Sequence, residues 1–131
     1  MDLETYELVI LRRPPNPMDY DEDTLNRLQL EHLAFYDDLR ARNICAINGP
    51  VLDQPDESLR GFGFFVTGSL ETAREIAEQD PSVQAGRLVV EAMTFWTQPQ
   101  PKSRRWFTTA RHVACPQKRN PERGNVRTVT T

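Results

Sequence analysis

The order of six segments, four typical of β-strands and two typical of helices, constrains the fold of this chain more than any other feature of its sequence. Four of them are rich in β-branched and aromatic residues and end near Pro, Gly or Asn, which is typical of β-strands. The other two carry apolar residues at spacings of three and four, as an amphipathic helix does. In chain order, the sequence predicts a strand at 6–12, a helix from 24 to 43, strands at 44–52 and 61–67, a helix from 70 to 80 and a strand at 87–96.

The order β-α-β-β-α-β limits the ways in which these elements can pack. Right-handed crossover connections place both helices on one face of a four-stranded antiparallel sheet. We therefore predict an α+β protein with the ferredoxin-like βαββαβ fold.

The ends of both helices carry residues that suit them. Asp21 or Asp23 can cap the first helix, and Asn43 accepts the left-handed conformation that often follows a helix. Ser69 is a good N-cap for the second helix. Because Pro81 disfavours helical geometry at the residue before it, we expect the second helix to end at Asp80.

The strands are apolar on both of their faces. In the first strand Leu8 and Ile10 point to one side, whereas Val9 and Leu11 point to the other. The two helices can cover only one face, so the second face needs another cover. A second copy of the chain provides one, and we predict a homodimer.

The charge divides the chain into two parts. Residues 1–97 hold 18 Asp and Glu and 8 Arg, a net charge of −10, whereas residues 98–131 hold 8 Lys and Arg and one Glu, a net charge of +7. The second part also has four prolines and no sustained apolar period. We expect a folded domain at 1–97 and a basic, irregular extension at 98–131.

A cytoplasmic location is expected from what the chain carries near its start and in its cysteines. The segment Met1–Glu7 has three acids and no basic residue, unlike a secretory signal, and no apolar run is long enough to span a membrane. Cys45 and Cys115 are far apart and suggest free thiols in a reducing compartment.

His32 lies on the apolar stripe of the first predicted helix. The stripe comprises Leu25, Leu28, His32, Phe35 or Tyr36, and Leu39. A histidine at such a position is either a buried side chain satisfied by a hydrogen bond or a group that faces a cleft. The pattern alone favours the first interpretation.

Asp80 lies at the predicted end of the second helix. The helix dipole disfavours a negative charge there, and an imidazolium is one cation that would stabilise it. The competing interpretation is that Asp80 only ends a helix, since Asp-Pro is common in turns.

The two residues are more informative as a pair. Both helices lie on one face of the predicted sheet, so His32 and Asp80 can meet. A carboxylate that accepts from one ring nitrogen leaves the other nitrogen free to accept a proton. Such a pair lacks a nucleophile, so it suits proton transfer, isomerisation or elimination better than acyl transfer.

An ordered set of residues resembles the pattern of the YCII-related family. The set covers about residues 5–97 and comprises His32, Gly49-Pro50, Gly61, Asp80-Pro81, Gly86 and Trp96. The resemblance implies a dimeric α+β barrel, an active-site pair at His32 and Asp80, and a cleft near Gly49 and Pro50. It also implies that aromatic residues, here Tyr36 and Phe64, contact the substrate.

The resemblance also limits what can be expected of the reaction. Some members of the family dehydrochlorinate hydroxyquinols, and related barrels isomerise lactones. Asn48 replaces the Gly that often precedes Gly-Pro in the family, and it can add a polar contact to a ligand. The basic extension has no counterpart in the family pattern.

Three functions follow from these observations. The leading one is an enzyme without a cofactor that transfers protons on a small cyclic or aromatic metabolite. The second is a non-catalytic protein that binds a small molecule in the same cleft. The third makes the basic extension the functional part, docking on an acidic or anionic partner; here nucleic-acid binding ranks low because residues 1–97 are acidic.

Metal-dependent and nucleotide-dependent classes find no support in the sequence. His112 and Cys115 lack two further ligands at a suitable spacing, so no zinc site is expected. No glycine-rich phosphate loop, GxSxG or HExxH motif occurs.

Overall fold

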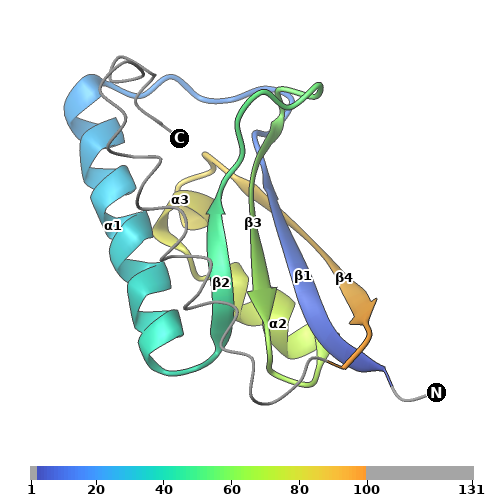
Figure 1. Ribbon diagram of the computed structural model, residues 1–131. Coiled ribbons are helices and arrows are strands. Elements are labelled where there is room, and N and C mark those ends of the chain that lie inside the picture. The colour runs from blue at the N-terminus through green and yellow to red at the C-terminus, as the bar shows by residue number, and fades with distance from the viewer. Residues whose placement is uncertain (1–2, 100–131) are drawn as a thin grey trace, which may run out of the picture.

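The computed structural model describes residues 3–99, which form one four-stranded antiparallel sheet and three helices. The strands follow the order β2-β3-β1-β4 across the sheet (Figure 1). This is the predicted α+β ferredoxin-like arrangement. The elements in chain order are β1 (Glu4–Arg12), α1 (Glu22–Ala41), β2 (Cys45–Pro50), β3 (Leu59–Phe65), α2 (Leu70–Ala77), α3 (Pro81–Gln84) and β4 (Val89–Thr97).

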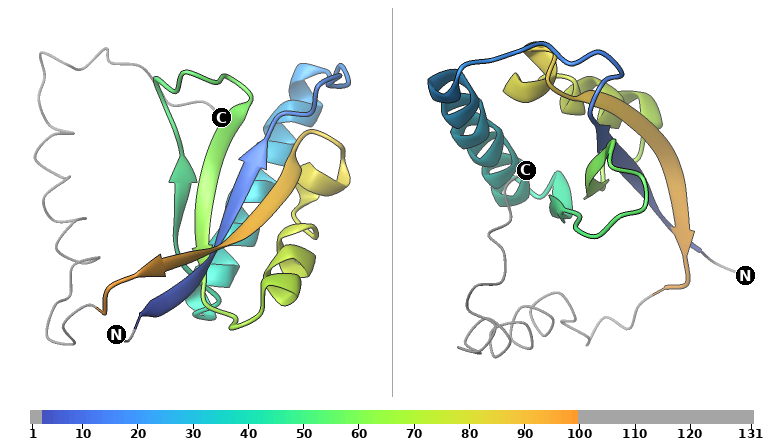
Figure 2. Two further views of the ribbon diagram at one scale, coloured as in Figure 1. Left: turned by 90° about the vertical axis from the view of Figure 1, so that its right-hand side faces the viewer. Right: turned by 90° about the horizontal axis from the view of Figure 1, so that it is seen from above.

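The helices lie on one side of the sheet, as predicted (Figure 2). We call this side the covered face; its core includes Val9, Leu11 and Phe65 from the strands and Tyr36 and Leu39 from α1. Val9 and Phe65 are fully buried. The apolar stripe of α1 therefore packs where its periodicity predicts.

The helix termini confirm most of the sequence-based expectations. The side chain of Asp21 accepts a hydrogen bond from the Thr24 amide at 2.7 Å, and that of Ser69 accepts from the Thr72 amide at 3.2 Å. Asn43 adopts a φ of 60°, the left-handed conformation expected after α1.

The prediction for the end of the second helix is wrong. Helix α2 ends at Ala77, and Asp80 is the N-cap of a separate short helix, α3. Pro81 occupies the first turn of α3, a position that suits proline because no helical hydrogen bond is lost there. The carboxylate of Asp80 therefore lies at the amide end of α3, where it accepts a hydrogen bond from the Ser82 amide, and not at the carbonyl end of α2.

The opposite side of the sheet, the open face, carries apolar side chains that no helix covers. Cross-strand partners share a face, and Tyr6 lies opposite Phe95 while Leu8 lies opposite both Phe64 and Met93. Phe64 contacts Tyr6 and Phe95 edge to face, with ring centroids 6.2 and 5.3 Å apart. Met93 and Phe95 remain 42% and 40% exposed. These exposures agree with the need for a cover, and the homodimer itself stays a prediction.

Two other expectations concern parts of the chain that the structure does not describe. Most of the basic extension and the residues His112 and Cys115 lie outside residues 3–99. None of the helices within those bounds is both long enough and apolar enough to cross a bilayer.

Candidate active site

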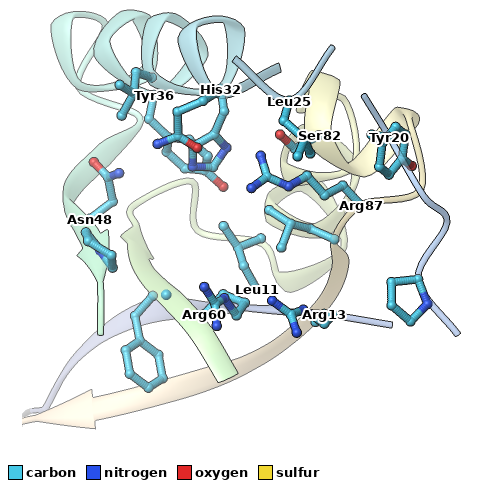
Figure 3. A pocket seen from close by; sticks show the side chains of 18 of the residues that line it. Leu11, Arg13, Tyr20, Leu25, His32, Tyr36, Asn48, Arg60, Ser82 and Arg87 are labelled. Atoms are coloured by element: carbon cyan, nitrogen blue, oxygen red, sulfur yellow. The ribbon is translucent and has the colours of Figure 1, made fainter. Parts of the chain in front are cut away.

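A cavity of about 520 Å³ lies beside the covered face of the sheet (Figure 3). Its walls come from the β1–α1 loop, from α1, from the β2–β3 hairpin and from the segment that links α3 to β4. Sites for small molecules have volumes of this order. The hydroxyl of Tyr20 donates a hydrogen bond to the Ala85 carbonyl and so attaches the β1–α1 loop to the α3 side of the cavity.

His32 and Asp80 are in contact in the wall of this cavity. The Nδ1 atom of His32 lies 2.6 Å from the Oδ2 atom of Asp80. Asp80 is fully buried, whereas the side chain of His32 is 15% exposed and lines the cavity. The second carboxylate oxygen, Oδ1, accepts a hydrogen bond from the Ser82 amide at 2.9 Å. Both oxygens of Asp80 are thus occupied, and the position of the carboxylate is fixed.

This contact determines which ring nitrogen can act on a ligand. An ionised carboxylate has acceptor atoms only, so a contact of Nδ1 with an ionised Asp80 requires the tautomer in which Nδ1 carries the proton. The Nε2 atom of a neutral ring then has a free lone pair.

Tyr36 lies against His32, with ring centroids 5.1 Å apart. Its side chain is 2% exposed, and within residues 3–99 its hydroxyl is a buried polar atom without a hydrogen-bond partner. Burial raises the pKa of Tyr36, and the negative charge of Asp80 raises it further. Tyr36 therefore remains a neutral phenol, and its hydroxyl is a buried donor next to the cavity.

The structure brings together most of the residues that the sequence suggested for substrate contact. Asn48, Gly49, Pro50 and Tyr36 all line the cavity. Asn48 also accepts a hydrogen bond from the guanidinium of Arg40, so one side of its amide is held in place.

Phe64 is the exception among these suggestions. It does not line the cavity and lies on the open face against Tyr6 and Phe95. The expectation that Phe64 lies in the cleft is therefore wrong. Its neighbour Phe65 faces the helices, and successive residues of a strand point to opposite sides.

The β2–β3 hairpin depends on a close approach of two backbones. A Cβ atom placed on Gly61 would lie 2.8 Å from the carbonyl oxygen of Gly49. No side chain fits at that distance, so the glycine at this position permits a close contact between the two backbones. Gly61 lets β2 and β3 form the wall that carries Asn48 and Pro50.

Three arginines in the cavity were not anticipated from the sequence. Arg13, Arg60 and Arg87 all line it, although they come from the β1–α1 loop, from β3 and from the α3–β4 link. No local spacing connects them, because only the fold brings the three segments together. Basic residues are few in 1–97, which is the one feature of the sequence that could have drawn attention to these arginines.

Cys45 has no part in the cavity. Burial raises the pKa of its thiol to about 11, so it stays protonated near neutral pH. Within residues 3–99, no three His, Cys, Asp or Glu side chains are grouped so that they could hold a metal ion.

Comparisons with known proteins include a similar solved structure, and they give no match among curated proteins. The structure is 5-chloro-2-hydroxyhydroquinone dehydrochlorinase (TftG) from Burkholderia phenoliruptrix AC1100 in complex with 2,5-dihydroxybenzoquinone. It is 18% identical in sequence and superposes with a TM-score of 0.49 over 69% of this chain and 90% of the other. An identity this low transfers no chemistry.

The sequence itself assigns the family. Residues 8–97, which include His32, Asp80 and the arginines of the cavity, match the YCII-related domain. This range is more than half of the 131 residues and covers all three helices and the sheet from Leu8 in β1 onward. The chain belongs to the YCII-related family.

Proposed function

We propose that this protein is a cofactor-independent enzyme that transfers protons on a small cyclic or aromatic metabolite. The observation that carries the proposal is the 2.6 Å contact between His32 Nδ1 and Asp80 Oδ2 in the wall of the cavity. A histidine whose proton is held on one nitrogen by a buried carboxylate is suited to act as a general base.

In the proposed reaction, Nε2 of His32 removes a proton from a carbon or hydroxyl group of the ligand. The imidazolium that forms is stabilised by the carboxylate of Asp80, which lies against Nδ1. The same proton is then returned to another atom of the ligand or to a leaving group. Elimination, isomerisation and cyclisation all follow this scheme.

Tyr36 would stabilise the charge that develops on the ligand. Removal of a proton next to a carbonyl or phenol leaves negative charge on an oxygen, and a fixed neutral donor favours that state. The Tyr36 hydroxyl is such a donor, and it has no partner within the described residues. Asn48, Gly49 and Pro50 would form the surface against which the ring of the ligand lies.

The first test is the tautomer of His32, measured through its ring-nitrogen chemical shifts by NMR. The wild type should show the proton on Nδ1, and Asp80→Asn should change the balance between the two tautomers. The spectrum of His32→Gln identifies the signals of His32 and separates them from those of His112. A wild-type ring protonated on Nε2 alone would contradict the proposal.

The second test asks whether protons are transferred at all. Small hydroxylated aromatics and lactones are incubated with the protein in deuterated water, and incorporation of deuterium at carbon is followed by NMR. The wild type should catalyse exchange with at least one of these compounds, and His32→Gln should abolish it. Binding of a compound without exchange in the wild type would favour the alternative, a non-catalytic protein that binds small molecules in the same cavity.

A further inference from the structure

The cavity that contains His32 also collects positive charge. Its lining includes three arginines, Arg13, Arg60 and Arg87, and a single acid, Asp19. Figure 3 shows their guanidinium groups facing the same space. Residues 1–97 contain 8 basic residues and carry a net charge of −10, so the cavity has the opposite sign to the domain around it.

The three charges influence one another. The pKa of Arg87 is lowered first by burial and then by the positive charges of Arg60 and Arg13, while Tyr20 acts in the opposite direction. Like charges that approach in a partly buried site repel, and their repulsion favours an anion that can bind between them.

In the part of the chain that the structure describes, the salt bridges of Arg12 have no counterpart at Arg13 and Arg60. Arg12 forms salt bridges to Asp56 at 2.9 Å and to Glu91 at 2.7 Å. Arg13, the next residue, forms no salt bridge within residues 3–99, and neither does Arg60. No acid of the described residues thus pairs with either guanidinium group; that of Arg60 donates a hydrogen bond to the Glu57 carbonyl at 3.4 Å, and both arginines line the cavity.

We propose that the ligand of this cavity carries an oxyanion group, a carboxylate or a phosphate, which Arg13, Arg60 and Arg87 bind. The inference rests on the proposed function, since it assigns the substrate class of the same cavity. Guanidinium groups present paired N–H donors that match the two oxygens of a carboxylate or phosphate.

The proposal divides the cavity into two parts with different tasks. The arginines hold a group of the ligand that does not react, while His32 and Tyr36 act on the ring. Binding energy from such a remote group can fix the orientation of the reacting atoms. The carboxylate of Asp80 is not part of the cavity lining, because it is fully buried and bonded to His32 and Ser82.

The test compares three small probes that share one ring: benzoate, phenyl phosphate and phenol. Their dissociation constants are measured by NMR titration with the full chain at low and high salt. At least one of the two anions should bind more tightly than phenol, and its binding should weaken as salt is added. The relative affinities of benzoate and phenyl phosphate tell which oxyanion the site prefers.

Variants then locate the binding group. Arg60→Gln and Arg87→Gln should each weaken binding of the preferred anion about tenfold or more, as expected for loss of a hydrogen bond to a charged group. Arg87→Lys should lose less than Arg87→Gln because the charge remains. Arg42→Gln is the matched control, since Arg42 pairs with Asp38 at the end of α1, outside the cavity, and should leave binding unchanged.

Thermal unfolding of each variant establishes that it is folded before its affinity is compared. The proposal is overturned if neither anion binds, if phenol binds as tightly as the anions, or if folded Arg60→Gln and Arg87→Gln proteins bind the anions as the wild type does. The tautomer of His32 is measured without any ligand, so it can fail while anion binding holds, and the reverse. Failure of the two proposals can therefore be told apart.

Discussion

The two faces of the sheet are built from the same strands but differ in how far their apolar side chains are buried within one copy of the chain. On the covered face, Val9 and Phe65 are fully buried under the helices, and the cavity lies beside them. On the open face, Met93 and Phe95 are about two-fifths exposed although they are equally apolar. The apolar pattern of a strand therefore reports that a residue needs burial, but not which molecule buries it.

The largest expected effect contrasts two adjacent residues of β3. Phe65→Ala removes a fully buried ring from the covered face, and we expect it to lower the free energy of unfolding by about 3–5 kcal/mol. Phe64→Ala removes a ring from the open face and should cost less than half as much. Urea unfolding at high protein dilution measures both, and equal losses would contradict the distinction between the faces.

The next contrast concerns two glycines on the paired strands of the hairpin, Gly49 in β2 and Gly61 in β3. Gly61→Ala places a methyl group 2.8 Å from the Gly49 carbonyl oxygen, and we expect a loss of about 1–3 kcal/mol. Gly49→Ala is the control, because a Cβ atom at that position has no neighbour within 4 Å. A Gly61→Ala protein as stable as Gly49→Ala would show that β2 and β3 can separate at no cost.

Tyr36→Phe tests a residue of the covered face that belongs both to the buried core and to the lining of the cavity. The change removes a buried hydroxyl without a partner in the described residues, so the free energy of unfolding should rise by about 1 kcal/mol. Binding of phenol or benzoate should weaken at the same time. A protein that becomes less stable and binds as before would show that the hydroxyl serves structure only.

The smallest expected effect on the unfolding of a single copy comes from the open face. We propose that this face pairs with a second copy of the chain. Phe95→Ser and Met93→Ser should then shift the protein from dimer to monomer in analytical ultracentrifugation while changing monomer stability by about 0.5 kcal/mol or less. Leu30→Ser is the control, because Leu30 is 68% exposed on α1, away from the sheet. A wild type that is monomeric at high concentration would refute the proposed dimer.

The elements of this fold could be predicted because their signals are local. Apolar spacing located α1, and the caps Asp21, Ser69 and Asn43 located the helix ends. The short helix α3 was missed, since four residues carry too few positions for any periodicity. Asp-Pro was read as the end of one helix, whereas the same dipeptide also suits the N-cap and first position of the next.

The site was predictable only where its residues also carry a local signal in the sequence. His32 stood out because a histidine interrupts an apolar stripe, and Asp80 because it precedes a proline. The three arginines did not stand out, because nothing in their local sequence marks them and only tertiary structure brings them together. Phe64 was misplaced because alternation predicts that Phe64 and Phe65 face opposite sides but not which side the helices cover.

The route of the chain around the cavity has a consequence for dividing the protein. The lining begins at Leu11 and ends at Leu88, and the exposed turn at Pro55 and Asp56 lies between these limits. A chain split at that turn would leave His32 on one fragment and Asp80 on the other. Neither fragment alone would contain both His32 and Asp80. Ligand binding and turnover would therefore require reassociation of the two fragments, and ligand binding would be a measure of that reassociation.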